Sequence, residues 1–142
     1  MGKRLIGSVG LAIAGGTPSP YTRTTSFVIA CSDETTALTT GTKVTFRLPF
    51  AFTVTEVRAS LTTAGTGANL VTLDFEQNTT SILSTKITID ATELTSTTAL
   101  TQPVISTSAL TDDASITCDV DQIDSGGVSA GLKMYLIGYK TL

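Results

Sequence analysis

The chain has 142 residues, a formal net charge of −3 and no histidine. This length suits one domain with a single core. Without histidine the usual Ser-His-Asp and Cys-His nucleophile systems are excluded, so we expect a protein that is not an enzyme. Threonine makes up about a fifth of the chain and charged residues only 15%, a composition that favours strands over helices and predicts an all-β protein.

The charges are unevenly distributed along the chain. Residues 1–24 carry Lys3, Arg4 and Arg23 and no acid, so the net charge of −3 leaves −6 for the remaining residues. Nucleic-acid binding needs a basic patch that neutralises phosphates, and three cations are too few for that task. We therefore expect no nucleic-acid partner.

Residues 1–24 differ in composition from the rest of the chain. Two early cations and a largely apolar stretch resemble a secretory signal, but Gly7 and Gly10 weaken the apolar segment, which is also too short to cross a bilayer. No membrane partner is expected, and the glycines and prolines disfavour a helix. We interpret the segment as an extended arm that docks onto a partner or a neighbouring subunit; the alternative is a frayed tail. The candidate docking residues are Leu5, Ile6, Val9, Leu11 and Ile13.

The segment Thr42–Leu61 shows the strand pattern most clearly. Apolar residues alternate with other residues from Val44 to Val54, and the alternation changes phase at Glu56. A phase change inside one strand predicts a β-bulge or a sharp bend, because a slip of one residue exchanges the two faces. Pro49 offers no N–H to a ladder, which indicates an edge strand or a bend.

Similar alternation predicts further strands on both sides of this segment, many of them separated by turns that contain glycine, asparagine or aspartate. Several short strands at this spacing are typical of an antiparallel β-sandwich or jelly roll. The predicted domain covers residues 25–142 and follows the extended arm of residues 1–24. The expected strands are Ser26–Cys31, Lys43–Leu48, Phe50–Leu61, Leu70–Gln77, Ile82–Asp90, Val104–Ser106, Ser115–Ile123 and Leu132–Tyr139.

The last expected strand is apolar on both faces. One face, with Leu132, Met134 and Leu136, suits the core. The other face must meet either a covering loop or another subunit, and tyrosine is enriched at interfaces because it is large and apolar with a polar tip. The candidate subunit-interface residues are Tyr135, Ile137 and Tyr139.

The two cysteines, Cys31 and Cys118, are far apart in the sequence and have no metal-binding spacing around them, so we expect no zinc site. Each has the parity of its apolar neighbours and is expected to point inward, where free cysteine behaves as a small apolar residue. Two buried thiols and a disulfide are both compatible with the sequence.

Carboxylates are the remaining candidates for acid–base chemistry. Asp74 and Glu76 share one face of an expected strand. A glycosidase would need two such groups flanking a sugar cleft, with the pKa of one of them raised. Exposed acids on the polar face of a strand are much commoner, so we expect both side chains to be exposed and assign no catalytic residue.

The segment Asp119–Asp124 resembles a calcium loop at first. It fails the pattern because Ile123 occupies a ligand position and because neither the required glycine nor the closing glutamate is present. Asp119 and Asp121 are expected to face solvent, and a cation that they share with Asp112 or Asp113 is left open. We assign no metal-ligating residue and expect no cofactor.

Four stretches of the body stand out as a set: FAFTVTEVRASLTTAGTG, TTSILSTKITIDATELTSTTA, PVISTSALTDDASITCDVDQI and GLKMYLIGY. Together they resemble a β-sandwich module that is common in the virion proteins of tailed bacteriophages. The resemblance runs from Ser26 to Tyr139 and is clearest at Ser81–Asp90 and Thr111–Ile123. The two cysteines are not part of the pattern, and the N-terminal arm lies outside it.

The resemblance implies a structural role on the virion, with no catalytic residues to carry over. The first hypothesis is a capsid decoration (cement) subunit, a homotrimer on the capsid surface with the major capsid protein or other virion subunits as partners. Cement stabilises the assembled state because it binds only that state, across subunit joints. The alternative is a tail-fibre or receptor-binding tip that recognises a host surface glycan or protein, although the loops contain almost no aromatic residue for sugar stacking.

Overall fold

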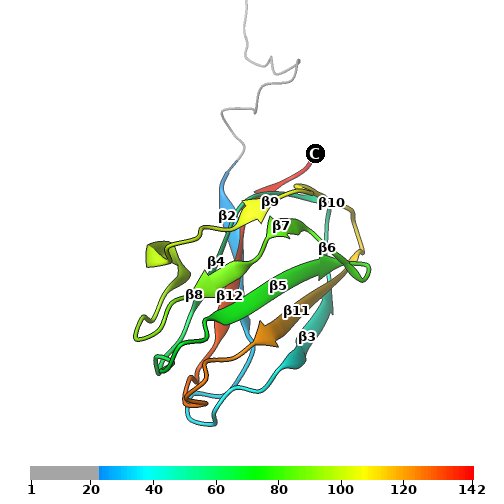
Figure 1. Cartoon of the computed structure of the whole chain (residues 1–142). Helices are drawn as coiled ribbons and strands as arrows, with labels where there is room; N and C mark the ends of the chain where they lie inside the picture. Colours follow the sequence, from blue (N-terminus) through cyan, green and yellow to red (C-terminus); the bar gives the residue numbers. More distant parts are fainter. Residues whose placement is uncertain (1–22) are drawn as a thin grey trace, which may run out of the picture.

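The computed structural model describes residues 23–142 and shows an all-β fold in which every pairing between the described strands is antiparallel. Two larger sheets form two layers (Figure 1). This confirms the predicted antiparallel fold and is consistent with a β-sandwich, while the finer jelly-roll assignment stays a prediction. The five residues expected on the docking arm lie outside the described residues.

The first sheet has the strand order β10-β4-β12-β2. These strands span Ala109–Leu110, Phe52–Ser60, Lys133–Lys140 and Thr25–Ala30. The second sheet has the order β3-β11-β5-β6, and β8 also pairs with β5. Its strands span Gly41–Arg47, Ser115–Gln122, Val71–Gln77, Thr80–Ser81 and Ile87–Ile89. A third, two-stranded sheet joins β7, Leu83–Thr85, to β9, Val104–Ile105.

The inward-facing side chains of the two larger sheets form one hydrophobic core. The predicted inner face of the last strand lies within it, because Leu132, Met134 and Leu136 are completely buried. Each large apolar side chain contributes roughly 2 kcal/mol when it leaves water. The largest fully buried side chains are Phe52, Phe75, Leu48, Leu73, Ile82, Ile87, Ile89, Ile116, Leu132, Met134, Leu136 and Val71.

A β-bulge in β4 confirms the phase change predicted at Glu56. Val54 pairs with Gly138 of β12, whereas Glu56 pairs with the adjacent residue Ile137, so Thr55 is the additional residue on β4. The apolar residues on both sides of the bulge therefore face the core.

The expected strand Ile82–Asp90 is wrong as a single strand. It divides into β7, which pairs with β9, and β8, which pairs with β5. Lys86 lies between the two and turns its side chain toward the ion pairs that it forms with Asp74 and Asp121. Leu83 before the break shares its parity with Ile87 and Ile89 after it, so alternation did not reveal the break.

Side-chain alternation did not predict three short elements. These are β6, β10 and the 3-10 helix η2, Ser96–Thr98, which lies in a loop that reads as polar and low in complexity. Ser96 is buried, and its Oγ accepts a hydrogen bond of 2.9 Å from the N–H of Ala59 on β4. Two- and three-residue elements contain too little of a repeat to be predicted, and long-range contacts such as this one hold them in place.

β2 and β3 are the outer strands at one side of the sandwich, where the rings of Phe27 and Phe46 lie 6.2 Å apart. Pro49 lies two residues after the end of β3, in the bend that leads to β4. Its position confirms the edge or bend that proline indicated in the sequence.

Gly138 provides a test of the bulge. A Cβ atom at this position would overlap the carbonyl oxygen of Thr53, and the backbone on both sides is fixed by the ladder. We expect Gly138→Ala to lower the free energy of unfolding by about 2 kcal/mol or more, measured by urea denaturation. Gly127→Ala is the control: it has a φ of 63° and open space around it, so only the cost of a left-handed alanine, about 1 kcal/mol, applies. A loss at Gly138 no larger than at Gly127 would contradict this account.

Candidate functional site

The predicted interface residues lie together on the outer face of the first sheet. Tyr135, Ile137 and Tyr139 alternate with the buried residues of β12 and are half-buried. Val28 of β2 pairs with Tyr135 and is 60% exposed. The hydroxyl groups of Tyr135 and Ser60 lie 2.9 Å apart, which orients the tyrosine ring. We call Val28, Tyr135, Ile137 and Tyr139 the outer stripe.

Next to the outer stripe, the side of the sandwich between β2 and β3 is incompletely closed. Its inward-pointing apolar side chains pack against the core but remain half-buried. Phe27 is central, with its ring centroid 5.2 Å from that of Phe52 and 5.9 Å from that of Phe50. Pro49 indicated an edge or a bend beside Phe46 and Phe50, but nothing in the sequence marked the strand of Phe27 and Ile29 as an edge strand. We call this set the edge seam: Phe27, Ile29, Val44, Phe46 and Phe50.

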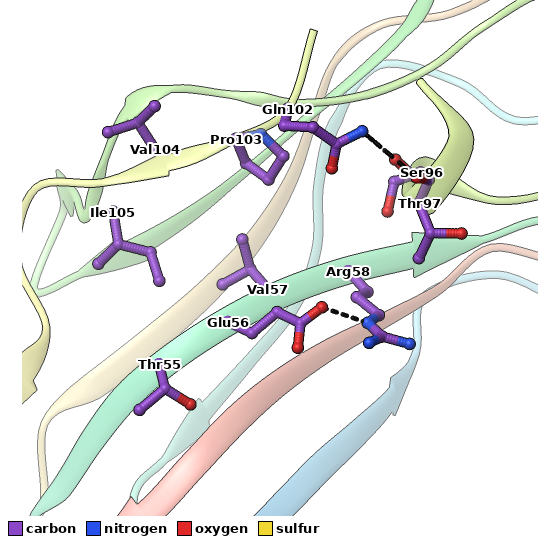
Figure 2. Close-up of a pocket in the computed structure, with 10 residues that line it drawn as sticks. All are labelled: Thr55, Glu56, Val57, Arg58, Ser96, Thr97, Gln102, Pro103, Val104 and Ile105. Carbon is purple, nitrogen blue, oxygen red and sulfur yellow. Dashed lines mark hydrogen bonds and ion pairs between the residues drawn. The ribbon is translucent and has the colours of Figure 1, made fainter. Parts of the chain in front are cut away.

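A groove of about 490 Å³ lies beside β4 (Figure 2). The side chains of Glu56 and Arg58 form an ion pair of 2.5 Å at one wall, and the side chain of Gln102 donates a hydrogen bond of 2.7 Å to the carbonyl oxygen of Ala99. No aromatic residue lines the groove, which therefore offers no stacking surface for a sugar ring. Sequence reasoning missed this groove because loops distant in the sequence form it. Its lining residues are Thr55, Glu56, Val57, Arg58, Ser96, Thr97, Gln102, Pro103, Val104 and Ile105.

Asp74 is buried, contrary to the exposed acid that we expected. It is 1% exposed, and its carboxylate accepts a hydrogen bond of 2.7 Å from Ser81 Oγ and forms an ion pair of 2.9 Å with Lys86 Nζ. The ammonium group of Lys86 also contacts Asp121 at 2.7 Å, and these two carboxylates raise the pKa of Lys86, Asp121 having the larger effect. The expectation failed because the side chains of Ser81 and Lys86, from segments beside β5, cover the carboxylate of Asp74.

Glu76 lies on the same face and contacts Asp119 of β11. Asp119 is half-buried rather than fully exposed to solvent. The hydrogen bond between the two carboxyl groups, with partial burial, raises the pKa of Glu76. A shared proton allows the carboxyl groups of Glu76 and Asp119 to lie close together. Lys86 neutralises the neighbouring carboxylates of Asp74 and Asp121. We therefore interpret the acids on this face as a structural cluster.

The structure places the candidate cation ligands at opposite ends of β11. Asp113 precedes the strand and pairs with Arg47 at 3.5 Å, whereas Asp121 is near its end and pairs with Lys86. Within residues 23–142, no group of three or more His, Cys, Asp or Glu side chains is arranged to hold a metal ion.

Asp124 has a different role from the calcium ligand considered from the sequence. It is 1% exposed and accepts backbone hydrogen bonds from Thr66, Val128 and Ser129 and a side-chain bond from Ser129. Burial alone would raise the pKa of Asp124, but these four hydrogen bonds lower it to about 2. The carboxylate therefore fixes two neighbouring loops as a charged hydrogen-bond acceptor.

Both cysteines are buried and free, so the reading as inward-facing thiols is confirmed. Cys31 follows β2 in the first sheet and Cys118 lies on β11 in the second, and the two thiols are close enough across the core to interact. The contact with Cys31, together with burial, raises the pKa of Cys118, which is therefore a neutral thiol at physiological pH.

Comparison with protein-family models, with curated proteins and with solved structures finds no match to this chain. In the part of the chain that the structure describes, no helix has the length and hydrophobicity needed to cross a membrane.

The buried carboxylate of Asp74 generates a stability prediction. Lys86→Met is expected to lower the free energy of unfolding by roughly 2–3 kcal/mol, because Asp74 is left buried without its cation. The loss stays below that of a fully enclosed pair because Lys86 is 41% exposed and water screens it. The control Asp121→Asn removes only the half-exposed partner and is expected to cost less than about 1 kcal/mol. Equal losses in chemical denaturation at pH 7 would contradict the role given to Asp74.

Proposed function

We propose that this chain is a structural protein of a bacteriophage virion and serves as a capsid decoration, or cement, subunit. The observation that best supports this role is the outer stripe. It offers an apolar surface with two tyrosines on a hydrogen-bonded sheet, which is the composition that protein interfaces favour. The likeness of the strand sequences to a phage virion module supports the same role.

In this proposal the subunit adds contact area across the joints of an assembled capsid. The outer stripe contacts neighbouring subunits, which gives a homotrimer, and the arm of residues 1–24 docks onto the major capsid protein or another virion subunit. A protein that binds only the assembled shell shifts the equilibrium toward that shell. The low charge and polar threonine surface of the chain suit a role that depends on contact area and needs no chemistry.

The arm provides the test of attachment. Deletion of residues 1–24 is expected to leave the cooperative unfolding of the sandwich intact and to weaken its binding to particles at least tenfold, measured by co-sedimentation. Serine at Val9, Leu11 and Ile13 should reproduce the loss, because these side chains supply the apolar contact. The control, glutamine at Lys3 and Arg4, changes only charge and should weaken binding less. Undiminished attachment of the deletion variant would refute the docking arm.

Cryo-electron microscopy of the same particles, with and without the arm, tests the proposed function itself. Density for this chain over the joints between capsomers is the expected result. Density at the tail tip or at the end of a fibre would favour the receptor-binding alternative, and absence of the chain from the particle would refute both roles.

The outer stripe generates a separate prediction. Replacement of both Tyr135 and Tyr139 by serine is expected to lower the native mass, measured by light scattering, while the midpoint of thermal unfolding changes little, because both rings are only half-buried. Serine at Leu94 and Leu100, which are exposed apolar residues elsewhere, is the control and should leave the mass unchanged. If unfolding shifts to lower temperature at constant mass, the face stabilises its own domain instead.

A further inference from the structure

The outer edge of β2 is open among the described residues. β2 is the last strand of its sheet and pairs only with β12. The N–H of Cys31, one residue beyond β2, donates to Leu132 O at 2.8 Å, on the side of β12. Because backbone groups alternate along a strand, the N–H and C=O of Ser26, Val28 and Ala30 point away from β12. No residue in the described part of the chain forms a hydrogen bond with these groups.

This edge lacks the devices by which edge strands usually avoid pairing. Such strands often carry lysine, proline or a bulge, each of which disfavours pairing with the strand of another chain. β3, the edge of the other sheet, has Lys43 and Arg47, and its ladder with β11 contains a register shift. The sequence of β2, TSFVIA, contains no charge and no proline, and its ladder with β12 is regular. Val28, near its middle, is 60% exposed.

We infer that β2 pairs with β2 of a second copy of this chain, antiparallel and across a two-fold axis at Val28, so that two four-stranded sheets become one continuous sheet. A two-fold contact is self-complementary: where one residue of the first copy faces a second residue of the other copy, the reverse contact also forms. With Val28 on the axis, its outward N–H and C=O close a pair of hydrogen bonds with Val28 of the second copy. Ser26 then lies opposite Ala30 of the second copy, and their outward groups also pair.

The side chains fit this register on both faces of the sheet. On the inner face Phe27 lies opposite Ile29 of the second copy, and both are half-buried members of the edge seam. On the outer face the two Val28 side chains meet and extend the outer stripe of each copy. Pairing therefore covers apolar surface that one copy leaves exposed, and a cross-strand contact of an aromatic with a β-branched residue contributes roughly 0.2–1 kcal/mol.

The charges at the ends of β2 agree with the antiparallel pairing. Arg23 precedes the strand and Asp33 follows it, and both residues are exposed. Antiparallel pairing brings the end of β2 that carries Arg23 to the end of the second copy that carries Asp33, twice in the dimer because of the symmetry. Opposite charges at these ends favour antiparallel over parallel pairing of the two strands.

This inference does not rest on the proposed function, and it assigns a two-fold contact at Val28 where the proposed function has a homotrimer. Cross-linking of a Val28→Cys variant of the full-length protein tests for the two-fold contact. Directly opposed residues in a hydrogen-bonded antiparallel pair have Cα atoms about 5.5 Å apart, within the range that a disulfide spans. Cys31 and Cys118 are buried and do not compete.

Oxidation of the Val28→Cys variant with diamide, which accepts the two electrons and two protons of the new disulfide, is expected to give a covalent dimer on a non-reducing gel. Val104→Cys, on β9 and similarly exposed at 51%, is the control and should stay monomeric on that gel. A second variant, Val28→Lys, places two like charges at the axis and should halve the native mass in light scattering without a change in the circular dichroism spectrum. A Val28→Cys protein that does not cross-link, or an unchanged native mass with Val28→Lys, would overturn the inference.

Discussion

The additional residue in β4 is the constraint on which the first sheet depends. Side chains alternate strictly between the faces of a sheet, so a regular β4 would turn one half of its apolar residues toward solvent. The bulge at Thr55 removes this conflict, and Gly138 on β12 leaves the space that the bulged backbone occupies. β12 then lies between β4 and β2 with one face fully buried, so its second face becomes an outer surface of the domain.

The two sheets use their outer faces differently. The first sheet presents the outer stripe, and its last strand, β2, has an open edge; Val28 belongs to both. The second sheet presents threonines and carboxylates on its outer face, with Lys86 and Ser81 laid over the buried Asp74. An apolar face beside an open edge suits contacts with other chains. The acids of the second sheet instead bind side chains of their own domain, as Asp74 binds Lys86 and Ser81. Apart from the docking of the arm, the contacts proposed for this protein therefore all lie on one sheet.

Sequence reasoning failed where a residue's surroundings come from distant parts of the chain. Alternation placed Asp74 on the polar face of β5, but it carries no information about what covers that face, and the side chains of Ser81 and Lys86 cover Asp74 there. The groove beside β4 was missed for the same reason, because segments remote in the sequence form its walls. Asp124 looked like a failed calcium ligand, yet it is a buried acceptor for backbone N–H groups of two loops, a role that only their proximity creates.

The sequence alone determined the all-β class, the inward face of most strands, the phase change in β4 and the burial of both cysteines. Each of these follows from local chemistry, because side-chain alternation and turn residues act within a few positions of the chain. The tertiary structure decided the order of the strands, and with it which strands are edges. Strand order arises from pairing between segments as far apart as β2 and β12, and alternation is the same in a central strand as in an edge strand. The exposure of Val28 and the half-burial of Phe27 therefore came from the fold.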